Sequence, residues 1–212
     1  MSDKRRPIQA RETRWAHTIA QWLYKSGLRP NSISVASIFF AALAGAAIAT
    51  SAQNLTGLIV GAVLIQFRLL CNLFDGMVAV EFGLKSKSGE LFNDAPDRLA
   101  DTFILIGVGY SLRTITWGSD LGWLAASLAV LTAYVRVLGV SAGSKTYFLG
   151  PMAKQHRMAL VTLACLLAAA EKYFWHSEYS LITALLIVIF GSAITAARRL
   201  HRIYLELESK PD

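Results

Sequence analysis

Charged residues are scarce in this chain of 212 residues. They make up 17% of the sequence, whereas a soluble domain carries roughly a quarter. Hydrophobic residues make up 54%, the mean hydropathy is +0.44, and the apolar residues come in blocks long enough to cross a bilayer. The composition therefore excludes an ordinary soluble domain and predicts an all-α integral membrane protein.

Cysteine is scarce as well, and the start of the chain has no apolar stretch. Cys71 and Cys165 lie inside apolar blocks, so we expect no structural disulfide framework. Residues 1–30 are polar and basic and have no apolar core region. We therefore expect no cleavable signal peptide.

Six apolar blocks predict six transmembrane helices. A spanning helix needs about 20 residues, so the third and fifth blocks suffice only if helices with polar ends continue beyond them. Such ends are tolerated where they face a cavity in the protein instead of lipid. The blocks cover residues 33–50, 56–80, 97–112, 121–142, 158–170 and 179–197.

The charges of the connecting segments predict the orientation. Lys and Arg cluster before the first block, after the second, after the fourth and after the sixth, whereas the alternate loops hold only Arg113 and Lys172. Basic loops face the cytoplasm, so both ends of the chain are expected there. This distribution also accounts for the net charge of +7 without a nucleic-acid partner.

The expected organisation has three parts. Within the first, Trp15, Ile19 and Trp22 can share an apolar face, which predicts an anchoring helix on the membrane surface, with a role in substrate access as the alternative. In chain order, the parts are a cytoplasmic segment (1–30) with an interfacial amphipathic helix over 8–26, a six-helix membrane domain (31–200) and a cytoplasmic tail (201–212).

Acidic and amide side chains gather where the second block ends and the third begins. Asn72 and Asp75 are three residues apart and share a helix face, and Asn93, Asp97 and Asp101 share another at a spacing of four. Carboxylates packed together repel one another unless a cation is bound. Oxygen ligands of this kind suit Mg²⁺, Mn²⁺ or Ca²⁺, not zinc.

The third helix is expected to have Pro96 in its first turn. Pro96 suits the first turn of a helix, where its missing N–H costs little, and Asp94 could cap this helix or add a ligand. The alternative to a metal site is a set of helix-end carboxylates that face water. These would pair with neighbouring basic residues, namely Lys85, Lys87 or Arg98.

This stretch resembles the signature of the CDP-alcohol phosphotransferase family, D-x2-D-G-x2-A-R-x8-G-x3-D-x3-D. The long fixed spacing makes the resemblance specific, and the six predicted helices extend it over most of the chain. The matching residues are, in order, Asp75, Gly76, Ala79, Gly89 and Asp97.

Three positions depart from the signature. Asn72 and Asn93 stand where the family has its first and third aspartates, and Val80 stands where it has arginine. The pattern is similar to a divergent bacterial branch of the family. The lost charges leave the number of metal ions open, one or two, and Asp94 and Asp101 are the acids that could compensate.

The resemblance implies transfer of a phosphatidyl group from a CDP-alcohol, such as CDP-diacylglycerol, to an acceptor alcohol with release of CMP. It implies Mg²⁺ or Mn²⁺ as cofactor, with Asp97 as the general base or, if the alignment shifts by four residues, Asp101 as the last ligand. The metal ligands it implies are Asn72, Asp75, Asn93, Asp94 and Asp97.

The resemblance also implies contacts for the nucleotide and the phosphates. The small residues of the signature would let the nucleotide approach closely, and basic residues would bind phosphate. The alternatives are a structural salt bridge for Arg136 and, for Lys154 and Arg157, positive charge that only sets the orientation in the membrane. The nucleotide set is Asn31, Ser34, Gly76, Ala79 and Gly89, and the phosphate set is Arg136, Lys154 and Arg157.

The surroundings and partners follow from the same resemblance. We expect a multi-pass protein of the bacterial inner (cytoplasmic) membrane, surrounded by lipid, with its active site facing the cytoplasm. Its partners would be a CDP-linked lipid donor, an alcohol acceptor and a second copy in a homodimer. The alternatives are a catalytically silent nucleotide- or metal-binding relative and a cation transporter. The acceptor stays open among glycerol phosphate, serine, inositol phosphate, another lipid and a sugar alcohol.

Overall fold

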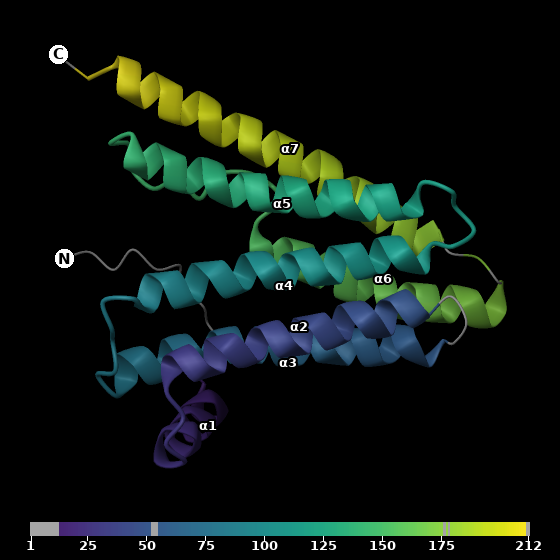
Figure 1. The fold of residues 1–212 in the computed structure, drawn as a ribbon, viewed down its shortest axis with the longest axis horizontal. Coiled ribbons are helices and arrows are strands. Elements are labelled where there is room, and N and C mark those ends of the chain that lie inside the picture. Colours follow the sequence, from purple (N-terminus) through teal and green to yellow (C-terminus); the bar gives the residue numbers. More distant parts are fainter. Residues whose placement is uncertain (1–12, 52–54, 176, 178, 211–212) are drawn as a thin grey trace.

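The computed structural model describes residues 13–51, 55–175, 177 and 179–210, and the described part is built from α-helices (Figure 1). The all-α prediction is thereby confirmed. One short helix precedes six long ones. The elements are α1 (Arg14–Lys25), α2 (Pro30–Thr50), α3 (Thr56–Glu81), α4 (Gly89–Ser111), α5 (Gly118–Ser141), α6 (Lys154–Phe174) and α7 (Tyr179–Glu208).

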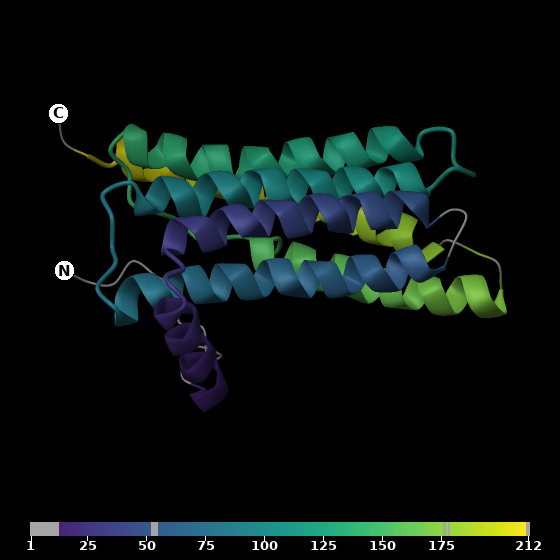
Figure 2. The same ribbon diagram turned by 60° about the horizontal axis from the view of Figure 1, so that its bottom comes forward.

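The six long helices form a ring in which helices consecutive in the chain run antiparallel, whereas the neighbours α2 and α4, and α5 and α7, run parallel. Helix α2 packs on α3 and α4, α5 packs on α4 and α7, and α6 closes the ring by packing on both α7 and α3. As a result, the first turns of α2, α4 and α6 gather at the same end as the last turns of α3, α5 and α7. Figures 1 and 2 show this end on the left, with α1 beside it.

The helices coincide with the six apolar blocks, but their composition is not uniform. Within the described residues, four helices are long and apolar enough to cross a membrane: α2, α3, α5 and α7. The other two, α4 and α6, have 23 and 21 residues and bury ionisable side chains, among them Asp97, Asp101 and Arg157. These three side chains therefore lie against protein.

The start of α4 differs from the prediction. The helix begins at Gly89, so Pro96 lies inside it, and the predictions that Pro96 occupies the first turn and that Asp94 caps the helix are wrong. The missing N–H of Pro96 leaves the carbonyl of Phe92 without its helical partner. Within these extra turns Asp94 forms a local i,i+4 ion pair with Arg98 and a tertiary one with Arg136 of α5, both of which favour the helical state.

The ends of α6 and α7 lie beyond the apolar blocks too. Helix α6 runs from Lys154 to Phe174 and so extends beyond both ends of the fifth block. Helix α7 continues to Glu208, so most of the stretch expected as a C-terminal tail is helical in the described residues.

Glycines allow α4 to contact its two neighbours backbone to backbone. A Cβ added to Gly107 would lie 2.3 Å from the carbonyl oxygen of Gly45 in α2, and one added to Gly109 would lie 2.7 Å from Cα of Gly122 in α5. Small residues permit such close crossings of membrane helices. The crossings fix the position of α4 and of the acidic residues in its first half.

Helix α1 docks on the last turns of α3. Ala16 and Ala20 are buried, and the ring of Trp15 meets that of Phe74 edge-on at 6.2 Å. Trp22 points away from the protein and is 63% exposed. An amphipathic helix is therefore present from Arg14 onwards, while residues 8–12 of the predicted helix lie outside the described residues.

Candidate functional site

A cavity of about 1330 Å³ lies at the end of the ring where α1 docks. Residues from all six long helices line it. All of the predicted site residues except Asp101 are in its wall, namely Asn31, Ser34, Asn72, Asp75, Gly76, Ala79, Gly89, Asn93, Asp94, Asp97, Arg136, Lys154 and Arg157. Residues far apart in sequence therefore meet around one space.

Asp75 is the acidic residue of α3 in this wall. It is 5% exposed and accepts a hydrogen bond of 2.6 Å from the hydroxyl of Ser34 in α2. Among the ion pairs of the described residues, none includes Asp75. Its negative charge is thus compensated by no cationic side chain in direct contact.

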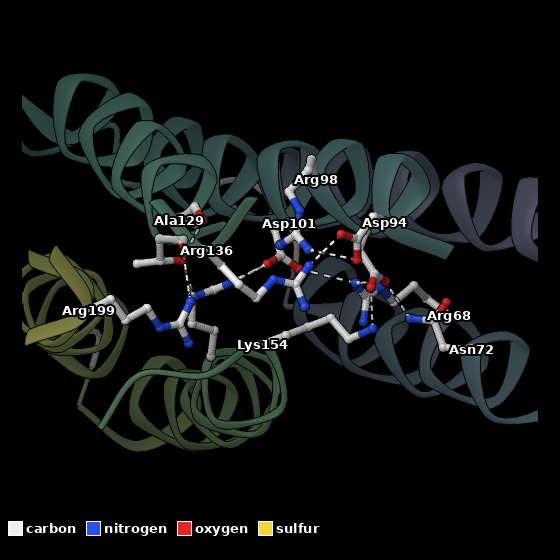
Figure 3. A network of polar contacts seen from close by, with 12 residues as sticks. Arg68, Asn72, Asp94, Arg98, Asp101, Ala129, Arg136, Lys154 and Arg199 are labelled. Carbon is white, nitrogen blue, oxygen red and sulfur yellow. Dashed lines mark hydrogen bonds and ion pairs between the residues drawn. The ribbon is translucent and has the colours of Figure 1, made fainter. Parts of the chain in front are cut away.

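Asp97 of α4 has quite different surroundings. Its Oδ1 accepts hydrogen bonds from Nη2 of Arg68 at 3.1 Å and from Nδ2 of Asn72 at 2.7 Å. Its Oδ2 contacts the ammonium group of Lys154, which reaches over from the first turn of α6 (Figure 3). Both oxygens of this carboxylate are therefore engaged by donors, two of them cationic.

The contact between Asn72 and Asp97 gives a physical account of the first departure from the signature. An aspartate at position 72 would place a second carboxylate against Oδ1 of Asp97 at hydrogen-bonding distance. Like charges so close repel and raise each other's affinity for a proton. The amide removes this repulsion and donates a hydrogen bond instead.

Asp101 lies one turn further along α4 and does not belong to the cavity wall. It is 1% exposed; its Oδ2 accepts bonds from Nη2 and Nε of Arg157 at 2.7 and 3.1 Å, and its Oδ1 accepts one from Arg68 at 3.1 Å. Arg157 also donates to the carbonyl of Met152 at 3.0 Å. Two guanidinium groups thus donate to both oxygens of Asp101, the carboxylate that the shifted alignment would make a metal ligand.

Arg68 is a central residue that the sequence did not single out for the site. It has no exposed surface, and its Nη2 bridges Asp97 and Asp101. Within the described residues, its Nε and Nη1 have no hydrogen-bond partner. The available signal was its spacing, because Arg68 precedes Asn72 by four residues and Asp75 by seven and so shares their helix face.

Arg199 of α7 is the other residue of the site that the sequence did not identify. It lines the cavity and donates to the carbonyl oxygens of Leu149 and Thr132 at 2.9 and 2.6 Å. The sequence placed it only among the charges that set the orientation. A signal was present, because Ser192, Thr195 and Arg199 are all buried on one face of an otherwise apolar helix.

The loop between α5 and α6 closes one side of the cavity and is attached to the end of α7. Glu206 accepts hydrogen bonds from the hydroxyl of Ser144 at 2.6 Å and from the backbone N–H of Lys145 at 3.1 Å. Further along the loop, Phe148 lines the cavity and the guanidinium of Arg136 lies 5.6 Å from its ring centre. The last turns of α7 therefore hold a segment that forms part of the wall.

The side chains at the cavity suit a hard divalent cation better at Asp75 than at Asp97. In the described residues, no three His, Cys, Asp or Glu side chains come together as a metal site. At Asp75 the contacting group is the hydroxyl oxygen of Ser34, and the amides of Asn72 and Asn93 line the same cavity. Oxygen ligands of these kinds suit Mg²⁺ or Mn²⁺. At Asp97, by contrast, cationic side chains already contact the carboxylate.

We compared the chain with known proteins to find relatives of this architecture. No family model matches the chain. The inner membrane protein YnbA of Escherichia coli is 24% identical over 177 residues, which cover 84% of this chain and 86% of that protein. Phosphatidylinositol phosphate synthase of Mycolicibacterium smegmatis is 22% identical over 195 residues, which cover 87% and 82%.

Solved structures give a stronger likeness in three dimensions. Mycobacterium tuberculosis phosphatidylinositol phosphate synthase with CDP-DAG bound superposes with a TM-score of 0.78 at 17% identity, over 94% of this chain and all of that one. The same enzyme with manganese and citrate gives 0.78 at 16% identity, over 93% of each chain. The likeness predicted from the signature is confirmed, because the chain shares its fold with a CDP-alcohol phosphotransferase.

Proposed function

We propose that this chain is a membrane transferase that moves a phosphatidyl group from a CDP-linked lipid to an acceptor alcohol and releases CMP. The observation that carries the proposal is the meeting of the signature residues around one cavity in this fold. The phosphatidylinositol phosphate synthase of the same fold binds CDP-DAG. A donor of that chemical class matches a polar cavity at the end of an apolar helix ring.

We further propose that α2 to α7 all span the membrane and that the cavity faces the cytoplasm. Within the described residues, the basic segments before α2, between α3 and α4 and between α5 and α6 lie at the cavity end of the ring, which the positive-inside rule assigns to the cytoplasm. The ionisable residues of α4 and α6 are buried in the ring, where polar groups are tolerated at membrane depth. Helix α1 would then lie on the inner membrane surface, with Trp22 in the lipid headgroups.

In this proposal the nucleotide lies over the small residues of α3 and α4. Gly76, Ala79 and Gly89 line the cavity. A Cβ added to Gly89 would meet only Ser86 Oγ, at 3.6 Å, so packing within the described chain gives no reason for glycine there. A bound nucleotide that approaches the backbone supplies such a reason. Asn31 and Ser34 of α2 provide hydrogen-bonding groups opposite.

The diphosphate of the donor would be bound by the basic residues that now pair with cavity acids. Arg136 and Lys154 form charge-assisted contacts with Asp94 and Asp97, and phosphate oxygens can replace those acceptors. A divalent cation held at Asp75 would neutralise the diphosphate and stabilise the departing CMP. Arg157 is directed at Asp101 instead, so its proposed contribution is to hold α4 and α6 together.

Asp97 is the residue we propose to accept the proton of the acceptor hydroxyl. When Lys154 moves from Oδ2 to the incoming phosphate, that oxygen becomes able to accept a hydrogen bond from the alcohol. The acceptor oxygen then forms a bond to the phosphorus of the phosphatidyl group, the bond from that phosphorus to the oxygen of CMP breaks, and the proton passes to Asp97. Arg68 and Asn72 hold Oδ1 and orient the carboxylate throughout.

A release assay tests the proposed function. Purified protein in nanodiscs receives CDP-diacylglycerol, Mg²⁺ or Mn²⁺ and, one at a time, the candidate acceptors, and CMP is measured by chromatography. We expect CMP only with the right acceptor, loss of release in Asp97→Asn, and unchanged release in Asp120→Asn, an exposed aspartate at the far end of the ring. Release that persists in Asp97→Asn would refute the assigned role of Asp97.

A second candidate function is a silent relative that binds the nucleotide without turnover. The paired state of Asp94 and Asp97 and the two asparagines favour it. In the same assay it predicts CDP binding to the protein and no CMP release with any acceptor.

A further inference from the structure

The chain supplies its own positive charges to most of the acids at the cavity. Asp97 contacts Lys154 and Arg68, and Asp94 contacts Arg136 and Arg98. Asp75 differs, because in the described residues it forms no ion pair and its side chain accepts a hydrogen bond from the neutral hydroxyl of Ser34. The need for an external cation is therefore concentrated at Asp75.

The substitutions in the signature agree with this distribution. Four aspartates carry enough negative charge for two divalent cations, but here two of the four positions are Asn72 and Asn93. The amide of Asn72 donates to Asp97, so it reduces negative charge at the very carboxylate that Lys154 contacts. A divalent cation bound at Asp97 would have to lie beside an ammonium and a guanidinium group, which repel it.

Lys154 is not simply another basic residue near the membrane surface. Its side chain is largely buried, at 27% exposed, and ends on a carboxylate that is 3% exposed. Lys85 provides the contrast, because it lines the same cavity, is exposed and forms no ion pair within the described residues. Position in the ring, not basic character alone, places the ammonium of Lys154 on Asp97.

We infer that the chain holds one divalent cation, at Asp75, and that the ammonium of Lys154 takes the place of a second cation at Asp97. This inference rests on the proposed function and specifies the cofactor requirement of that site. It also joins two features into one, because Asn72 and Lys154 are complementary: an aspartate at position 72 suits a divalent cation, and an asparagine suits a lysine. Restoring an aspartate at position 72 without removing Lys154, or removing Lys154 without restoring that aspartate, leaves the charges around Asp97 unbalanced.

Counting bound Mn²⁺ tests the inference without relying on turnover. Protein in phosphatidylcholine nanodiscs is titrated with Mn²⁺ alone, and the free ion is measured by electron paramagnetic resonance. We expect one ion per chain in the wild type, none in Asp75→Asn, and two in Asn72→Asp combined with Lys154→Met. The matched control Lys85→Met, which removes another cavity lysine, should keep one ion.

Three results would overturn the inference: two ions in the wild type, one ion retained in Asp75→Asn, or only one in the folded double variant. The first two need no variant with an altered charge pair, so the inference stays testable if the double variant does not fold. The count also separates the two proposals. Two bound ions together with CMP release refute the single-cation inference alone, whereas one bound ion without CMP release for any acceptor refutes the transferase alone.

Discussion

Replacement of Asp101 by asparagine distinguishes a structural carboxylate from a catalytic one. The Asp101 side chain is buried and neutralises Arg157, while sharing Arg68 with Asp97. Removing one partner of a buried ion pair costs about 3–5 kcal/mol, because the other charge is left without compensation. Asparagine keeps one acceptor oxygen, so we place Asp101→Asn at the lower end, about 3 kcal/mol.

The expected loss is large enough to measure by thermal unfolding. One kcal/mol lowers the Tm of a chain of this size by about 2–4 °C, so Asp101→Asn should unfold roughly 6–12 °C earlier. Tryptophan fluorescence in a single detergent follows the transition, and Asp120→Asn serves as the control. We expect CMP release per folded molecule to survive well below the new Tm.

A compensating pair makes the reasoning stricter. Asp101→Leu combined with Arg157→Met removes both charges, and such replacements of buried pairs are often neutral or stabilising. The double variant should therefore be more stable than either single variant. A double-mutant cycle then gives the coupling free energy between Asp101 and Arg157. An Asp101→Asn protein with an unchanged Tm and no CMP release would refute this account and favour the shifted alignment, in which Asp101 is a ligand.

Three further changes test other parts of the structure. Gly89→Ala should leave the Tm within a few degrees but raise the KM for the CDP-linked donor about tenfold, equivalent to roughly 1.4 kcal/mol, and an unchanged KM would show that no ligand approaches there. Gly107→Val forces a side chain against the backbone of α2 and should destabilise by about 1–3 kcal/mol or more, seen as a lower Tm; equal stability would contradict the close crossing. Glu206→Ala should expose the bond after Lys145 to faster tryptic cleavage and raise KM, whereas Glu208→Ala, an exposed neighbour, should change neither; equal cleavage of the two would refute the attachment of the loop.

Much of the fold could be predicted because membrane helices are governed by length and apolarity. The six blocks are the cores of α2 to α7, and the signature spacing brought Asp75 and Asp97 to one cavity. The start of α4 could not be predicted, because residues 89–96 resemble a polar loop when read locally. In the fold Asp94 meets Arg136 of α5, a contact between residues 42 apart in sequence that no local pattern contains.

The pairing inside the site was the least predictable part. Asp97 and Asp101 both fit the D-x3-D spacing, and Gly89 favoured Asp97. Both are buried, but one helical turn separates the residue in the cavity wall from the one outside it. The choice depends on how α6 closes the ring, because that packing brings Lys154 to the first and Arg157 to the second. No local pattern contains this information, and the sequence did not identify Arg68 or Arg199 as residues of the site.

The central claim is transfer of a phosphatidyl group, and the product lipid tests it most directly. Nanodiscs with CDP-diacylglycerol, a divalent cation and an acceptor alcohol are sampled over time, and lipids and nucleotides are quantified together by mass spectrometry. The account predicts a new phospholipid that carries the acceptor and grows in equal amount with CMP. CMP that forms with phosphatidic acid as the only lipid product, or donor that is bound and never consumed, would contradict it.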